Sequence, residues 1–467
     1  MVRFSRTCKT VKQFASSISF ASVLQSVAIF AFIFAMSHFS NVEEYAEYRR
    51  FFYVVDFSTA ISLFGLNTLL LRKPLRSLYE DIIPTIIIIN VIQLIVVLFF
   101  MFIQHFTIIK YIEIVLFVAL NTLYQLCVSI IVLKNLRKLY FLCTSTCFCV
   151  TVISLILLVY FNSLTFFNAY LLRILILALY NIPLCLYAGN RIWKIKFSSM
   201  KHLLSLFKEA APIGLGVLLG SCTQYIDKFI ASMMDSYQLA VYANASADIP
   251  FVGTAITTMS VFFIPIIHKC YTNKDFSGAC GNISSLFLFG WYIGVSVFTL
   301  LFCNAEFVVG LLYSSQYKES VVLFRIFCMA YLLRIVSYTQ LIVSLELENI
   351  IVKRMLIELV LQFALSFSLF KVLGPLGLAM SVIIVLGLWS VPYNVTYFKK
   401  RLKCKYSDII PLKQMGIFFL KAFVPCLIVS VLLSYFKCKV IIVFFVTILV
   451  YFALNFKEIK FVFKNIK

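Results

Sequence analysis

Long apolar runs, separated by short basic or polar segments, follow one another along almost the whole chain. Most runs reach about 20 residues, the length at which a helix crosses about 30 Å of hydrocarbon. Helix-period amphipathicity is weak, and the strict alternation expected of β-barrel strands is absent from the runs. The pattern therefore predicts an all-α, polytopic membrane protein.

Fourteen transmembrane helices are predicted from the positions of these runs. Because the first run is too long for the apolar region of a cleaved signal peptide, we favour a membrane span there. The predicted spans are 14–37, 51–71, 82–104, 111–133, 139–161, 164–188, 207–233, 239–268, 283–304, 320–344, 351–373, 376–398, 415–436 and 439–456.

Composition excludes a soluble globular enzyme. Hydrophobic residues make up 62% of the chain and charged residues 13%, and the mean hydropathy is +1.00. A soluble domain has about 45–50% apolar and about 25% charged residues. The chain thus has half the charge that a water-facing surface needs.

The distribution of Lys and Arg predicts the orientation. With the N-terminus in the cytoplasm, 29 of the 41 cations fall in cytoplasmic segments, 7 in outer loops and 5 within spans. This count assigns Arg354 to a cytoplasmic loop. The bias follows the positive-inside rule and predicts that both termini are cytoplasmic. It also explains the net charge of +22 without a nucleic-acid partner.

The basic segment 189–206 divides the first twelve predicted helices into two groups of six. We predict an N-terminal six-helix bundle at 1–188, a cytoplasmic linker at 189–206, a C-terminal bundle at 207–398, and a basic loop with two last helices at 399–467. Six helices per half allow parallel repeats about an axis along the membrane normal. The first helix of each half is rich in small and polar residues, which favour either close packing or a cavity lining.

Charged and amide side chains inside the spans are the candidate site residues. A charge at membrane depth costs about 2.5–3.5 kcal/mol, so such residues face a cavity or a partner. We predict substrate-binding cations at Arg173, Arg334, Arg325 and Lys228, cavity or ion-coupling acids at Asp227, Asp248 and Glu358, and cavity amides at Gln25, Gln224 and Asn244. A structural ion pair within the bundle, or a side chain that reaches the membrane interface, is the alternative, and it is favoured for Asp56 and Lys421 near the span ends.

Helical spacing predicts which of these side chains share a face. Asn244 and Asp248, four residues apart, should lie on one face, whereas the adjacent Asp227 and Lys228 should diverge and pair poorly. Arg325 and Arg334, nine apart, should lie on opposite faces unless their helix is broken.

No catalytic or metal motif occurs in the sequence. The four His residues do not cluster, and the P-loop, HExxH and GxSxG patterns are missing. Cys143, Cys147 and Cys149 have no His or carboxylate beside them, so they are interpreted as small apolar packing residues. The outer loops are too short for a catalytic module. We expect a transporter with no resident cofactor and no metal, coupled to H⁺ or Na⁺.

The stretch 211–267 resembles flippases of the polysaccharide-transporter family, which belongs to the superfamily of multidrug, oligosaccharidyl-lipid and polysaccharide exporters. The matching features are Pro212 opening the seventh helix, Asp227 within it, and a Tyr242–Ala245 start and a Pro265 end for the eighth. The second helix adds Phe64-Gly65-Leu66 followed by Arg72.

The resemblance implies a flippase of the bacterial inner membrane. Its substrate would be an undecaprenyl-diphosphate-linked oligosaccharide, the repeat unit of an O antigen or capsule, moved by alternating access. Membrane lipid, a polysaccharide polymerase and a chain-length regulator are the implied partners. Two alternatives stay open: a multidrug exporter of the same superfamily, which should favour an acidic cavity, and a membrane polysaccharide polymerase, which would normally need a larger outer loop.

Overall fold

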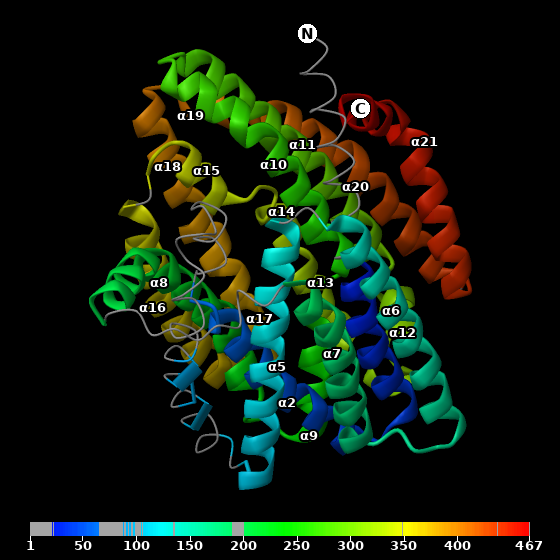
Figure 1. The fold of residues 1–467 in the computed structure, drawn as a ribbon. Coiled ribbons are helices and arrows are strands. Elements are labelled where there is room, and N and C mark those ends of the chain that lie inside the picture. The colour runs from blue at the N-terminus through cyan, green and yellow to red at the C-terminus, as the bar shows by residue number, and fades with distance from the viewer. Residues whose placement is uncertain are drawn as a thin grey trace. The chain divides into compact units, whose positions relative to one another are not determined.

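The computed structural model describes residues 21, 23–64, 106–133, 136–188, 200–347, 349–436 and 438–466, and positions 87, 90, 91, 93, 94, 97, 98 and 104. The described residues are helical, with turns and short connections between the helices (Figure 1). The chain forms two compact units, Met1–Leu239 and Ala240–Lys467. The sequence places the helix predicted at 207–233 first in the second half. In the structure this helix packs within unit 1, so the boundary between the units lies after it.

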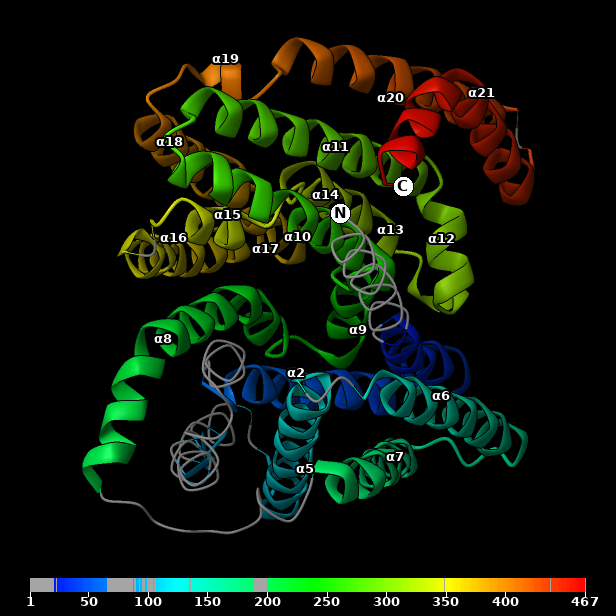
Figure 2. The same cartoon turned by 45° about the horizontal axis from the view of Figure 1, so that its top comes forward.

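Unit 1 is built from helices that pack against one another. In Figure 2, α5 and α7 lie side by side, α6 packs against α7, and α2 packs against α5 and α8. Their bounds are Val23–Phe39 for the first apolar helix, α2 Val42–Ile61, α5 Ile108–Leu133, α6 Arg137–Tyr160, α7 Phe166–Ala188 and α8 Met200–Ala231.

Unit 2 contains both long helices and short interrupted ones. Its long helices are α10 Pro250–Thr272, α11 Phe276–Cys303, α16 Asn349–Leu373, α20 Leu412–Tyr435 and α21 Val440–Ile466. Its shorter elements are α9 Ser236–Ala245, which begins in unit 1, α12 Ala305–Leu312, η2 Ser315–Tyr317, α13 Ser320–Cys328, α14 Ala330–Leu333, α15 Tyr338–Ser344, α17 Pro375–Ile384, the π-helical segment η3 Val385–Ser390, α18 Val391–Leu402 and α19 Tyr406–Ile409.

The predicted fold class, an all-α multi-pass membrane protein, is confirmed. Within the described residues, eight helical segments are long and apolar enough to cross a membrane, and Val23–Phe39 and Val440–Phe456 are shorter apolar helices. The predicted number of fourteen spans and the cytoplasmic termini stay predictions. The start of the first span, most of span 82–104, Gly65, Leu66 and Arg72, and linker residues 189–199 lie outside the described part of the chain.

Several predicted helix ends are wrong. The second helix spans 42–61 rather than 51–71, since the Asn41 side chain accepts a hydrogen bond from the Glu44 backbone N–H at 2.7 Å and caps its start. Pro212 lies well inside α8 and Pro265 well inside α10, so neither marks a helix end as expected.

Two predicted continuous spans are broken in the structure. The span 239–268 consists of α9 and α10, separated at residues 246–249. The span 320–344 consists of α13, α14 and α15, and Arg334, at φ −90° and ψ 44°, ends α14. Both breaks lie close to predicted site residues.

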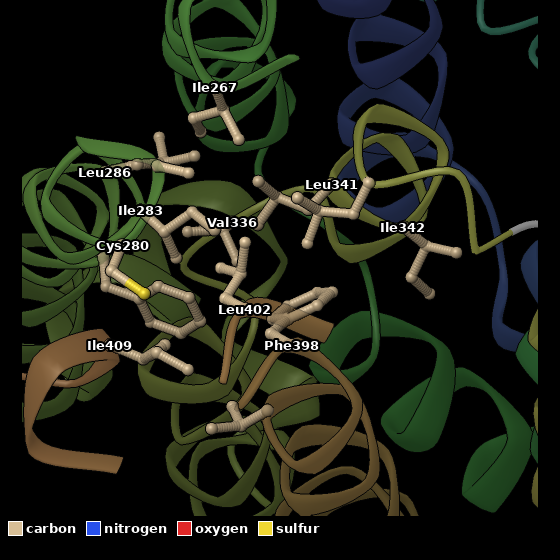
Figure 3. Packing of buried hydrophobic residues seen from close by; sticks show 14 of the residues in the cluster. Ile267, Cys280, Ile283, Leu286, Val336, Leu341, Ile342, Phe398, Leu402 and Ile409 are labelled. Atoms are coloured by element: carbon tan, nitrogen blue, oxygen red, sulfur yellow. The ribbon is translucent and has the colours of Figure 1, made fainter. Parts of the chain in front are cut away.

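The main hydrophobic core of unit 2 joins α10, α11, α15, α18 and α19 (Figure 3). Ile283, Leu286 and Leu341 are fully buried in it, and Phe398 packs among them. This core fixes α15 and α18 against α11, and so holds the segments on either side of the helix breaks.

The last two helices, α20 and α21, pack on α11 through polar contacts as well as apolar ones. The Ser430 hydroxyl donates to the Cys303 carbonyl at 2.8 Å, and the Thr447 hydroxyl donates to the Asn304 side chain at 2.8 Å. Lys421 forms an ion pair with Glu458 at 2.6 Å, in agreement with the structural role favoured for it.

Close backbone approach makes Gly290 of α11 a sensitive position. A Cβ there would overlap the carbonyl oxygen of Ile335, beside the break between α14 and α15. We expect Gly290→Ala to destabilise the protein by about 1–3 kcal/mol, the usual cost of overpacking. Thermal unfolding of the purified protein in detergent measures this. Gly281→Ala in the same helix is the control, since its Cβ meets nothing within 4 Å. Equal melting temperatures for the two variants would contradict the expected clash.

Candidate functional site

Two helix breaks in unit 2 are stabilised by side-chain hydroxyls. Each hydroxyl accepts a hydrogen bond from a backbone N–H group at the break. The Ile249 N–H, in the α9–α10 break, donates to the Tyr331 hydroxyl at 3.2 Å. The Ser337 N–H, in the α14–α15 break, donates to the Ser260 hydroxyl of α10 at 3.1 Å. In a membrane, each unsatisfied backbone group costs several kcal/mol, so these side chains make the breaks tolerable.

A third irregularity, the π-helical segment η3, lies beside α14. A Cβ on Gly387 of this segment would lie 3.6 Å from Leu333 Cδ1, just before the end of α14. π-helical turns occur frequently at functional sites. Interrupted helices at membrane depth often form transporter ion and substrate sites. These irregular segments therefore define a candidate site, called here the broken-helix site.

Arg334 and Asp248 carry opposite charges at the two breaks of this site. Arg334 Nη1 lies 3.7 Å from Asp248 Oδ1. Both side chains are exposed, at 44% and 67% respectively. The ion pair thus connects the α9–α10 break with the α14–α15 break, and both of its side chains are accessible to solvent.

A second ion pair of the broken-helix site is buried. Arg354 Nε of α16 lies 3.7 Å from Glu358 Oε2, one helical turn along. Arg354 Nη1 also donates to the Asn394 side-chain oxygen of α18 at 3.1 Å, and the Asn394 amide donates to the Ser390 carbonyl at 2.8 Å. Arg334 is also among the charges within electrostatic range of Glu358.

In unit 1, aromatic rings enclose Arg173 of α7. Its guanidinium carbon lies 3.7 Å from the centre of the Phe52 ring and 5.3 Å from that of Phe117. Its Nη1 donates to the Tyr48 hydroxyl at 3.1 Å. Such stacking stabilises a partly desolvated guanidinium through the ring quadrupole.

Further charges lie near Arg173. Asp56 of α2 lies within electrostatic range of Arg173, Arg49 and Lys228. The structural ion pair favoured for it stays a prediction. Lys228 Nζ lies 3.5 Å from Asp227 Oδ1 and donates to the Gln224 carbonyl at 2.8 Å. The prediction that the adjacent Asp227 and Lys228 pair poorly is wrong, because the long lysine side chain folds back along α8.

The remaining predicted site residues are dispersed. Arg325 lies 3.5 Å from Glu306 in an exposed pair. The Gln25 side chain accepts from the Tyr124 hydroxyl at 3.1 Å, and the Gln224 side chain is exposed. Asn244 is fully buried in α9.

The predicted shared face of Asn244 and Asp248 is wrong, because the helix ends at Ala245 and Asp248 lies in the break. The break at Arg334 likewise removes the regular spacing that placed Arg325 and Arg334 on opposite faces. At both breaks the irregular backbone, and not regular helical spacing, therefore sets the directions of the Asp248 and Arg334 side chains.

Sequence reasoning did not single out Arg354: the predicted span 351–373 includes it, but the charge count assigned it to a cytoplasmic loop. In the structure Arg354 is buried inside α16. Its four-residue spacing from Glu358 was the available signal, since residues four apart are neighbours on a helix. Asn394, its partner on α18, offered no comparable signal. Among the described residues, no group of three potential metal ligands occurs.

The ring contacts make Arg173 a position where lysine is a poor substitute. Arg173→Lys keeps the charge but loses the stacking and the fixed hydrogen bond to Tyr48, so we expect a loss of about 0.5–2 kcal/mol. Thermal unfolding of the purified variant measures it. Arg325→Lys is the matched control, because exposed ion pairs contribute about 0–1 kcal/mol. A larger loss in the control than in Arg173→Lys would show that the aromatic enclosure contributes little.

Comparison with known proteins gives matches in structure. No protein-family model matches the chain, and no curated protein matches it in sequence. The lipid II flippase MurJ, in an inward closed conformation, matches with a TM-score of 0.66 and 14% identity over 95% of this chain and 98% of that chain.

Transporters of the MOP superfamily match as well. An inward-facing multidrug resistance MATE transporter of the MOP superfamily has a TM-score of 0.64 and 11% identity over 83% of this chain and 99% of that chain. A MOP transporter from Pyrococcus furiosus, described as having a binding pocket of reverse polarity, has a TM-score of 0.53 and 10% identity over 84% and 96%. The chain therefore has the multi-pass helical fold of MOP-superfamily transporters.

Proposed function

We propose that this chain is a flippase of the bacterial inner membrane that translocates undecaprenyl-diphosphate-linked oligosaccharide repeat units of an O antigen or capsule by alternating access. The observation that carries the proposal is the exposed Arg334–Asp248 pair at the broken helices of unit 2. The fold, shared with MOP-superfamily transporters, supports transport as the general activity.

An exposed ion pair within apolar spans indicates contact with water. Each charge facing lipid would cost about 2.5–3.5 kcal/mol, and a pair separated by 3.7 Å does not offset this for two exposed groups. Arg334 and Asp248 therefore fit the wall of a hydrated cavity. A glycan head group can cross a membrane in such a cavity while its prenyl tail stays in lipid.

Arg334 is the better candidate of the two predicted diphosphate-binding arginines. A guanidinium grips phosphate oxygens with two parallel hydrogen bonds, which requires access to its planar edge. The Arg334 side chain is exposed, whereas the Arg173 face is covered by Phe52 and one of its nitrogens donates to Tyr48. In this proposal Arg173 supports the structure of unit 1 and Arg334 contacts the substrate.

A multidrug exporter is the second candidate function. Asp248 is even more exposed than Arg334 and offers a carboxylate to an amphipathic cation. Matches to MATE exporters favour this alternative on fold alone. A membrane polymerase is less favoured, because the solved structures that share the fold are transporters. A polymerase and a chain-length regulator are instead proposed as partners that use the translocated repeat units.

Neutral substitutions of the exposed pair separate these functions. We expect Arg334→Gln to reduce surface polysaccharide strongly, by about tenfold or more for the loss of a charge-assisted contact, while Asp248→Asn, which leaves Arg334 unpaired, retains it. Quantification of surface glycan in a gene-deletion strain carrying each variant provides the measurement. Equal losses would indicate a structural ion pair, and a loss confined to Asp248→Asn would indicate an acid-dependent exporter.

Charge reversal gives a stricter version of this experiment. The double variant Arg173→Glu and Arg334→Glu should abolish transport, because the residue at 334 becomes repulsive to phosphate and the residue at 173 loses its ring contacts and its hydrogen bond to Tyr48. Protein amount in the membrane, measured on the same cells, controls for misfolding. Intact transport in this variant would refute a role for either arginine in diphosphate binding.

Deletion of the gene tests the substrate class directly. We expect complete single repeat units on the lipid carrier to accumulate at the cytoplasmic face, with loss of surface polysaccharide. Accumulation of single units at the outer face would instead indicate a polymerase. Unchanged glycans with altered drug sensitivity would indicate a multidrug exporter.

A further inference from the structure

The buried Arg354–Glu358 pair has no role in the substrate contacts proposed above. The two residues are only 6% and 9% exposed, and both lie in α16. Replacing such a pair by apolar residues is often neutral or stabilising, so fold stability alone does not explain its presence.

The guanidinium of Arg354 occupies the position that a metal cation would need. It faces the Glu358 carboxylate at 3.7 Å and the Asn394 side-chain oxygen at 3.1 Å. The Ser390 carbonyl, a further oxygen nearby, already accepts from the Asn394 amide. A Na⁺ ion placed among these oxygens would lie next to a fixed positive charge. The arrangement therefore disfavours a metal ion beside Glu358.

A proton, in contrast, can bind there. Arg354 Nε and Glu358 Oε2 are both buried and, within the described part of the chain, neither has a hydrogen-bond partner. At 3.7 Å the two groups attract each other electrostatically but are too far apart for a hydrogen bond. Burial favours the neutral carboxylic acid and Arg354 favours the carboxylate, so the two effects oppose each other.

Other titratable groups also face this pair. Arg334 interacts electrostatically with Glu358, and Tyr338 of α15 and Tyr393 of α18 interact with Arg354. The Ser390 hydroxyl, at the end of the π-helical segment, lies within interaction range of the Glu358 carboxyl. Arg354 and Asn394 thus connect the protonation state of Glu358 with the segment 385–390.

We propose that Glu358 is a proton-binding site in which Arg354 serves as a built-in counter-ion in place of Na⁺, and that protonation of Glu358 releases Arg354 and shifts the π-helical segment. Its role as the coupling site of transport rests on the proposed function. Proton binding and the shift of the segment do not.

Trp389 offers a direct reporter, because it lies in the π-helical segment next to Ser390. The chain has three tryptophans, Trp193, Trp291 and Trp389. In the variant Trp193→Phe, Trp291→Phe, the emission of purified full-length protein in lipid nanodiscs reports Trp389 alone. Titration from about pH 4 to about pH 9 should give one sigmoidal shift in emission. At fixed pH, exchange of Na⁺ for choline should leave the emission unchanged.

Three further variants in this single-tryptophan background test the assignment. Glu358→Gln should remove the pH response, and Arg354→Lys, which keeps a counter-ion, should retain it. Arg354→Gln should create a response to Na⁺, because the carboxylate has lost its internal cation. If Glu358→Gln does not fold, the neutral pair Arg354→Gln with Glu358→Gln replaces it, since removing both partners leaves no unpaired buried charge.

Each contrary result overturns the proposal. A pH response that persists without Glu358 places the proton elsewhere. A Na⁺ response at fixed pH with Arg354 present indicates a metal site. A flat titration with Glu358 present indicates a permanent structural pair. Because no transported substrate is used, these results are independent of whether the flippase assignment holds.

Discussion

The cost of leaving a polar group unpaired in hydrocarbon governs where this chain departs from regular helix. Each break frees backbone groups, and each lies where a side chain from another helix can bond to them, as Tyr331 does for Ile249 and Ser260 for Ser337. The same condition applies to the charges. Arg173 is covered by rings and Glu358 has Arg354 beside it, whereas Arg334 and Asp248 are exposed. In the proposed function, this exposed pair lies in the wall of a hydrated cavity.

Hydropathy was sufficient to predict the fold class, because a span needs only a long apolar run. Helix ends were less predictable, since Asn41 starts α2 within a polar stretch that hydropathy assigns to a loop. The breaks were harder still. Pro250 follows one of them, but the residues that stabilise both, Tyr331 and Ser260, are distant in sequence and carry no local signal.

For the candidate site, the sequence identified which residues were charged but seldom their partners. Spacing along one helix reveals a pair such as Arg354 and Glu358, whereas Arg334 and Asp248 meet only through the packing of different segments. The aromatic enclosure of Arg173 was unpredictable for another reason. The chain has 49 Phe residues, and nothing local distinguishes Phe52 and Phe117 from the rest.

The length of α11 makes its tilt depend on the thickness of the bilayer. Its 28 residues extend about 42 Å at a rise of about 1.5 Å per residue, which exceeds the roughly 30 Å of a typical hydrocarbon core. Such a helix must tilt or project beyond the acyl chains, and a thicker bilayer is accommodated by a smaller tilt. α11 packs against α10, α14 and α20. A change in membrane thickness that alters the tilt of α11 would therefore also act on α10 and α14, the helices beside the breaks.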